Sequence, residues 1–343
     1  MINLFFISLL IFTASSVYLF KKYYLPKLET FSTFIYFAYN ISKINPLNLD
    51  IYLTNNPLFQ NRIQFIKFAR EDFNYLYRSS SNSIVITTYE RPECFRKVFE
   101  KIITYRPPDT EIIICDDASE SEEKKQLLKE IADNYTMQNV YVIIHTQNFG
   151  SFHTKLDGFL FCSGNFIMSI DDDDDFNQNF YIELASNINK FNSSENKYDF
   201  IIPAVNDAFD WVHFPVTIKI MVETYHNHVS FAFRRSLMKI VNYPDHNFRI
   251  YRDDAPLMIP LFIQSDDSKV YHYLNHNQYI IGGINCSTVH EERFFTKKNS
   301  RQFYFNGLIF IMKFTRKYGN FNYINSYKIA YPDRDIPYDY FKI

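Results

Sequence analysis

Residues 83–115 read SIVITTYERPECFRKVFEKIITYRPPDTEIIIC, which is a helical pattern between two runs of strand-forming residues. SIVITT (83–88) and EIIIC (111–115) are rich in β-branched side chains, as is typical of strands that are buried on both faces. Pro92 suits the first turn of a helix. The apolar residues after it recur at helical spacing: Phe95, Val98, Phe99, Ile102 and Ile103. This stretch predicts a strand, a helix and a second strand.

The same alternation continues along the chain. Strand-like runs recur at VYVII (140–144), FIMSI (166–170) and DFIIP (199–203), and helical segments are expected at 120–134, 154–162 and 180–191. Apolar strands that alternate with helices pair in parallel and need cover on both sides of the sheet. The sequence therefore predicts an α/β fold with a mostly parallel, Rossmann-like sheet that is covered by helices.

Polar side chains follow three of the predicted strands. The first strand ends at Thr87 and Thr88, and the loop after it contains Tyr89–Arg91. Asp116 and Asp117 follow the second strand, and the aspartates 171–175 follow the fourth. Ligands of open parallel sheets bind at this carboxyl edge. Five consecutive carboxylates repel one another unless a cation or solvent lies among them, and Mg²⁺ and Mn²⁺ prefer oxygen ligands. A metal site is the favoured interpretation, and a solvated acidic loop is the alternative.

Four motifs in this order resemble the family 2 glycosyltransferases, which have the GT-A fold. They are IVITTYERPE (84–93), IIICDDAS (112–119), N-x-G-x₄-K-x₂-G-x₅-G (148–164) and FIMSIDDDDD (166–175). The resemblance covers about a third of the chain, from Ser83 to Asp207. Only 7 glycines occur, and Gly150, Gly158 and Gly164 all fall in the third motif. Since glycine permits close backbone approach, we interpret them as a turn and helix that pass close to a diphosphate and to the next strand.

The resemblance implies a nucleotide-sugar site. It assigns Asp116 to the nucleotide base, with Asp117 as a neighbour, and Lys155 to the diphosphate. The aspartate run corresponds to the D-x-D signature, which contacts the ribose and holds the metal that bridges the phosphates. The complete set implied for the nucleotide sugar is Thr87, Tyr89, Glu90, Asp116, Asp117, Lys155, Asp171 and Asp172, and the set implied for Mn²⁺ or Mg²⁺ is Asp171, Asp173, Asp174 and, from a late position, His290.

An acidic pair downstream is the candidate for general base. Transfer of a sugar leaves charge on the nucleoside diphosphate, which a metal and a cation offset, while the attacking hydroxyl needs a base. The resemblance implies Asp254 as that base and Asp253 as its neighbour. The alternative is a surface acidic pair that caps a helix.

We therefore expect a metal-dependent, inverting transferase for hexosyl or N-acetylhexosaminyl groups. The donor would be a nucleotide-diphosphate sugar, UDP-linked in preference to GDP- or dTDP-linked, and the acceptor a hydroxyl on a glycan, lipid or protein. A non-catalytic sugar-binding or scaffold protein is the alternative. A nucleotidyltransferase is less favoured, because that class usually has a Gly-rich basic loop where this chain has Thr-Thr-Tyr-Glu-Arg.

The first residues form an apolar segment. Ile2–Phe20 carries no charge and is long enough to span a bilayer as a helix, so we predict an uncleaved anchor, with a cleaved signal peptide as the alternative. Lysines after the segment favour a cytoplasmic catalytic domain; the alternative is the lumen of the Golgi or ER. The expected organisation is an anchor (1–22), a stem (23–81), a catalytic domain (82–262) and a helical, acceptor-side extension (263–343).

Composition excludes other classes. The net charge of −2 argues against a nucleic-acid partner, and 47% hydrophobic residues exclude wholesale disorder. The 4 cysteines lack metal-binding or disulfide-framework spacing. We therefore predict that Cys115 and Cys162 are small buried hydrophobic residues.

Overall fold

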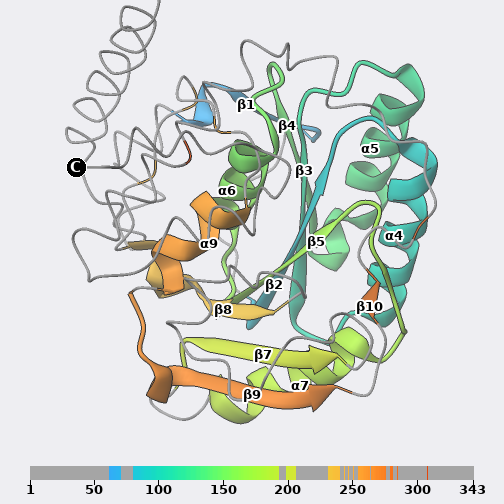
Figure 1. The fold of residues 1–343 in the computed structure, drawn as a ribbon. Coiled ribbons are helices and arrows are strands. Elements are labelled where there is room, and N and C mark those ends of the chain that lie inside the picture. The colour runs from blue at the N-terminus through green and yellow to red at the C-terminus, as the bar shows by residue number, and fades with distance from the viewer. Residues whose placement is uncertain are drawn as a thin grey trace, which may run out of the picture. The chain divides into compact units, whose positions relative to one another are not determined.

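The computed structural model describes residues 62–70, 80–192, 198–205, 231–239, 254–262, 264–275 and 279–280, together with residues 243, 246, 250, 284 and 307. Within them, the main sheet has the strand order β1-β4-β3-β2-β5-β8-β7-β9, and β10 pairs with β6 beside it (Figure 1). The strands are β1 (Ile66–Phe68), β2 (Asn82–Thr88), β3 (Thr110–Asp116), β4 (Val140–His145), β5 (Phe166–Asp171), β6 (Asp175–Phe176), β7 (Phe200–Val205), β8 (Ala232–Arg234), β9 (Val270–Asn275) and β10 (Tyr279–Ile280).

The centre of the sheet is parallel, as the sequence predicts. β2 pairs in parallel with β3 and with β5, and β3 pairs in parallel with β4. Every residue of β2 and β3 is buried, which explains why these strands read as continuous apolar runs rather than as alternating patterns.

Two short strands make the sheet mixed. β8 runs antiparallel to β5 and to β7, and β1 runs antiparallel to β4. The sequence does not reveal either strand, because three residues are too few to display a period of two. The mostly parallel prediction is therefore correct for the strands that carry the motifs and incomplete for the sheet as a whole.

Helices cover both faces of the sheet. α4 and α5 lie on one face and α6 lies on the other (Figure 1). Ile84 and Ile86 of β2 share a hydrophobic core with Val98 of α4 and Leu128 of α5. The helices are α4 (Pro92–Tyr105), α5 (Glu122–Tyr135), α6 (Ser151–Phe161), α7 (Phe180–Asn192) and α9 (Asp254–Phe262), with the short 3₁₀ segments η3 (Thr136–Gln138), η4 (Arg235–Lys239) and η5 (Asp267–Lys269).

Gly158 lets α6 approach the sheet closely, and Gly164 lets the turn after α6 do the same. A Cβ on Gly158 would lie 2.4 Å from Cγ1 of Val85 in β2, and one on Gly164 would lie 2.5 Å from the backbone carbon of Asn82. These distances are too short for any side chain. The glycine motif therefore fits the predicted passage of a helix close to the neighbouring strand.

The sheet extends beyond the predicted catalytic boundaries, 82–262. β1 comes from the segment that we interpreted as a stem, and β9, which we placed in the helical C-terminal extension, pairs with β7. β9 reads VYHYLN, and its content of β-branched and aromatic residues fits a strand. The extension thus begins with a strand of the main sheet.

The predicted anchor, Ile2–Phe20, lies outside the described residues. Among the residues that the structure describes, no helix has both the length and the apolar character needed to cross a membrane. Cys115 and Cys162 are buried, as predicted. Cys94 of α4 is disulfide-bonded, which the wide spacing of the cysteines did not suggest.

Candidate functional site

The strand register brings the polar strand ends together. Thr87 of β2 stands opposite Asp171 of β5, and Thr88 stands opposite Asp116 of β3. Because all three strands are parallel, their carboxyl ends meet at one edge of the sheet. The predicted gathering of carboxylates at this edge is therefore present.

Asp171 is held by two groups from different elements. Thr87 donates its hydroxyl hydrogen to Oδ1 at 3.0 Å, and Nζ of Lys155, from α6, lies 3.0 Å from Oδ1 and 3.2 Å from Oδ2. Burial alone would raise the pKa of Asp171, but Lys155 and Thr87 outweigh it and lower that pKa below its ordinary value. Asp171 is therefore an ionised carboxylate beside a lysine, and its side chain is still 44% exposed.

The next two aspartates share one arginine. Arg91 binds Asp172 through Nη2 and Asp173 through Nη1, the latter at 2.6 Å. Asp172 is buried and also accepts from the hydroxyl of Thr88. Burial raises the pKa of Asp172 to about 6, although Arg91 and Lys124 act in the opposite direction. Asp173 is more open, with a side chain that is 29% exposed.

The run then turns into a strand. The backbone N–H of Asp174 donates to the carbonyl of Asp171 at 3.2 Å, which closes a turn with Asp172 and Asp173 at its centre. Asp174 is buried. Asp175 begins β6 and pairs with Lys101 of α4. The five aspartates therefore face different partners.

Two cations at this site, Arg91 and Lys124, are not among the site residues that we predicted from the sequence. Arg91 precedes α4, and Lys124 of α5 is buried, donates to Thr88 Oγ1 at 2.6 Å and lies 3.6 Å from the centre of the Phe95 ring. Burial lowers the pKa of Lys124 to about 8 against the opposing effect of Asp172 and Asp116. Part of the repulsion that we expected a metal to relieve is thus relieved by these protein cations. The pairing of β2 with β5 brings the end of β2 next to the aspartates. Had this pairing been known, it would have identified Arg91, in the loop after β2, as their partner.

Asp116 and Glu90 organise the loop before α5. Asp116 accepts from the backbone N–H of Ser119 at 2.8 Å and from its hydroxyl at 2.5 Å. Glu90 accepts from the N–H groups of Glu120 at 2.6 Å and Ser121 at 3.2 Å. Glu90 therefore shapes the loop, because each of its carboxylate oxygens accepts a backbone N–H. Tyr89 follows β2 and is half-buried.

Asp117 faces a different neighbourhood from Asp116. Its carboxylate accepts from the N–H groups of Phe149 and Gly150, both at 2.8 Å, and lies 2.8 Å from Nδ1 of His145. Asp117 therefore holds Phe149 and Gly150, which form the loop ahead of α6 and are called the glycine loop below. Adjacent residues of an extended chain point in opposite directions, which accounts for the different partners of Asp116 and Asp117.

The remaining predicted residues are only partly described. Asp254 is the first residue of α9, as expected for an acidic residue that begins a helix. Asp253 and His290 lie outside the described residues. The backbone near the C-terminal part of the chain does reach the aspartates, because Ile284 donates its N–H to the carbonyl of Asp173 at 2.9 Å.

The aspartate run offers the type of ligand that a hard divalent cation prefers. Asp171 and Asp173 supply two partly exposed carboxylates, and Mg²⁺ in particular is commonly held by one or two carboxylates with substrate phosphates as the other ligands. Among the described residues, the run does not form a group of three converging ligands; the group that does is His145, Asp157 and His246, behind the glycine loop.

A family comparison identifies the motif-bearing region. The model of glycosyl transferase family 2 matches residues 83–255, which is half of the chain. No match was found among curated proteins.

Solved structures were compared with the chain separately. TarS from S. aureus superposes with a TM-score of 0.46 at 15% identity, over 58% of this chain and 36% of TarS. A mannosyltransferase from Pyrobaculum calidifontis, solved with GDP-Man and Mn²⁺, gives a TM-score of 0.43 at 11% identity, over 73% of this chain and 64% of that chain. The chain thus spans between about a third and two thirds of the length of these structures.

Proposed function

Because the chain belongs to glycosyl transferase family 2, we propose that it transfers a sugar from a nucleotide-diphosphate donor to an acceptor hydroxyl, with the help of a divalent cation. UDP is the proposed nucleotide. The observation that carries this proposal is the meeting of Asp171, Thr87 and Lys155 at the carboxyl edge of the sheet, where a carboxylate and a cation lie 3.0 Å apart.

The exposed members of the aspartate run are the proposed metal ligands. Asp171 and Asp173 keep solvent-facing carboxylate area, whereas Asp172 and Asp174 are buried. We therefore assign the cation to Asp171 and Asp173, and Asp172 to fixing the turn through Arg91 and Thr88. When bound there, a divalent cation supplies Lewis-acid stabilisation of the leaving diphosphate.

The protein groups divide the remaining work. Lys155 lies beside Asp171 and offsets the charge that grows on the diphosphate as its bond to the sugar breaks. Asp254 takes the proton of the acceptor hydroxyl, whose oxygen forms the new bond to the sugar. Attack from the side opposite the leaving group gives inversion. Support for Asp254 comes from the family motif; its place at the start of α9 fits the helix-capping alternative equally well.

Calorimetry with UDP tests the metal assignment. We expect UDP to bind in the presence of Mn²⁺ and to lose affinity by about tenfold or more in Asp173→Ala, because a charged contact to the cation is removed. Asp175→Asn is the matched control: it removes a carboxylate from the same run, but one that pairs with Lys101 instead, so UDP affinity should stay within about twofold.

Equal loss of UDP affinity in the two variants would contradict the assignment of Asp173. Binding of UDP by the wild-type chain that is indifferent to divalent ions would contradict the metal itself. UDP binding without turnover of any donor would support the non-catalytic alternative.

A further inference from the structure

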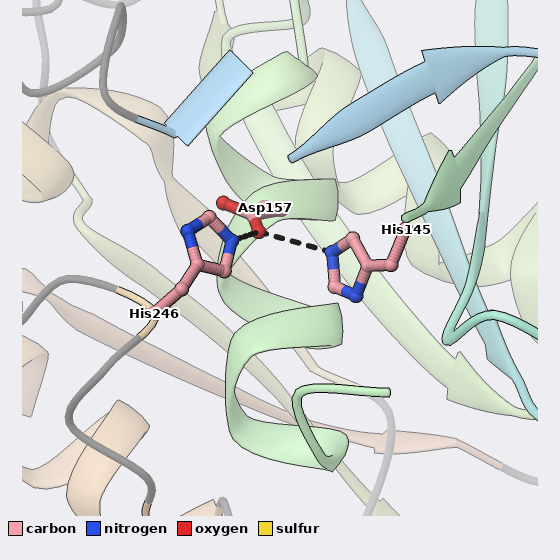
Figure 2. Close-up of side chains that lie close together, drawn as sticks. All are labelled: His145, Asp157 and His246. Carbon is pink, nitrogen blue, oxygen red and sulfur yellow. Dashed lines mark hydrogen bonds and ion pairs between the residues drawn. The ribbon is translucent and has the colours of Figure 1, made fainter. Parts of the chain in front are cut away.

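A buried cluster of two histidines and an aspartate lies behind the glycine loop. His145 ends β4, Asp157 belongs to α6, and His246 comes from a distant part of the chain; none is more than 2% exposed. Figure 2 shows both imidazole rings directed at the carboxylate of Asp157. Oδ2 of Asp157 lies 3.0 Å from Nε2 of His145 and 2.6 Å from Nε2 of His246.

His145 lies between two carboxylates. Its Nδ1 is 2.8 Å from Asp117 and its Nε2 is 3.0 Å from Asp157. An ionised carboxylate only accepts hydrogen bonds, so both ring nitrogens must donate, and the ring is an imidazolium ion. Burial alone would lower the pKa of His145, but Cys115 and the hydrogen bonds to both carboxylates raise it well above the ordinary value.

The other polar groups complete a neutral network. Arg62 binds the second oxygen of Asp157 and lies 3.1 Å from Nδ1 of His153. Burial and the charge of Arg62 lower the pKa of His246, so its ring is neutral and donates through Nε2. Its Nδ1 has no hydrogen-bond partner among the described residues, which suits an unprotonated nitrogen. Among the residues that the structure describes, two cations, Arg62 and His145, therefore balance two carboxylates, Asp117 and Asp157.

A bound metal is the competing interpretation of the cluster. Three ligand atoms of His145, Asp157 and His246 lie within 4.8 Å of one another, but the nitrogen–oxygen separations of 2.6 and 3.0 Å are those of hydrogen bonds. A dication would displace the donated protons and would sit beside the guanidinium of Arg62. Charge and geometry therefore favour protons over a metal.

The network continues into the donor site through Asp117. That carboxylate binds the N–H groups of Phe149 and Gly150, and the carbonyl of Gly150 accepts from the N–H groups of His153 and Thr154 in the first turn of α6. Lys155 is the next residue and reaches Asp171. Gly150 has φ of +90°, a conformation that the hydrogen bonds from Asp117 help to hold.

We propose that His145 is a positioning residue: as an imidazolium ion it ties Asp117 to Asp157, and thereby fixes the glycine loop and α6 so that Lys155 faces the donor diphosphate. The part of this inference that concerns the donor rests on the proposed function. The part that concerns the loop is independent of it.

Two isosteric substitutions separate the two hydrogen bonds of the His145 ring. His145→Asn keeps a donor near Nδ1 and so retains the bond to Asp117, whereas His145→Gln keeps a donor near Nε2 and retains the bond to Asp157. We expect Mn²⁺–UDP affinity to fall by about tenfold in His145→Gln, from loss of a charged hydrogen bond, and by less in His145→Asn. The donor KM should change more than kcat.

Amide hydrogen exchange provides a readout without any donor. Exchange at Phe149 and Gly150 should be faster in His145→Gln than in His145→Asn. Equal exchange and equal UDP affinity in the two variants, at matched thermal stability, would overturn the positioning role. If the wild-type chain binds no nucleotide, the proposed function fails, and the exchange comparison still decides whether His145 fixes the loop.

The protonation state of the wild-type ring is the second measurement, and it applies even if both variants fail to fold. Nitrogen-15 NMR should show the His145 ring with both nitrogens protonated at pH 7. A neutral ring would overturn the proposal. So would a stoichiometric metal ion that remains after dialysis without chelator and is released by EDTA together with a shift of the His145 and His246 signals.

Discussion

At the scale of single residues, the donor site and the buried network differ in how visible they are in the sequence. Asp171 and Lys155 stand in short motifs, so the sequence alone singles them out as candidate site residues. His145 could not, because its partners are 28 and 12 residues away, at Asp117 and Asp157, and His246 is 89 residues from Asp157. The packing of α6 against the sheet makes His145 and Asp157 neighbours.

The charge on His145 predicts a pH dependence of stability. A histidine whose pKa is higher in the folded than in the unfolded chain stabilises the fold below the unfolded value, about 6.5, and this stability is lost as pH rises towards the folded pKa. The free energy of unfolding should therefore fall by up to about 1.4 kcal/mol per pH unit above pH 6.5. His246, with its lowered pKa, acts below that pH.

Urea denaturation between pH 6.5 and 8.5 measures this slope. His145→Asn should be less stable than the wild type at pH 6.5, and the difference between the two proteins should shrink as the pH rises to 8.5. Lys124 and Asp172 also titrate near this range, but they contribute equally to both proteins. The same slope in both proteins would mean that the His145 ring is not charged in the folded state.

At the scale of secondary structure, predictability followed the length of the pattern. The central strands and α4 were found within one or two residues, because each repeats its period several times. β1 and β8 have three residues each and were not predicted. The helix start at Ser151, three residues before the predicted start, follows from Gly150 and Asp117 rather than from hydrophobic periodicity.

The close packing of α6 predicts different costs for two glycine substitutions. Gly158→Ala directs a methyl group at a flexible methyl of Val85, whereas Gly164→Ala directs it at the backbone of Asn82 and Ser83. Overpacking typically costs about 1–3 kcal/mol, so we expect Gly158→Ala within that range and Gly164→Ala at or above its upper end.

Chemical denaturation of the two variants and of a double variant checks this expectation. Val85→Ala removes the methyl groups that Gly158→Ala would meet, so the double variant should recover part of the cost relative to the sum of the single changes. Fully additive effects, or a smaller cost for Gly164→Ala than for Gly158→Ala, would contradict the packing described for α6.

At the scale of the whole molecule, the described region accounts for the donor side of the proposed reaction. The family model ends at residue 255, and the predicted acceptor side lies mostly beyond it. Cys94 is disulfide-bonded, and disulfides persist mainly in oxidising compartments.

Release of nucleotide from a panel of nucleotide sugars tests the central claim most directly. The chain is incubated with each donor, with Mn²⁺ or with EDTA, and the nucleoside diphosphate formed by transfer or slow hydrolysis is measured. We predict that one UDP-linked donor releases its nucleoside diphosphate only with Mn²⁺. We also predict that Asp254→Asn lowers the rate of this release with little change in UDP affinity. If no donor is bound or cleaved with any divalent cation, the proposal of a metal-dependent glycosyltransferase is wrong.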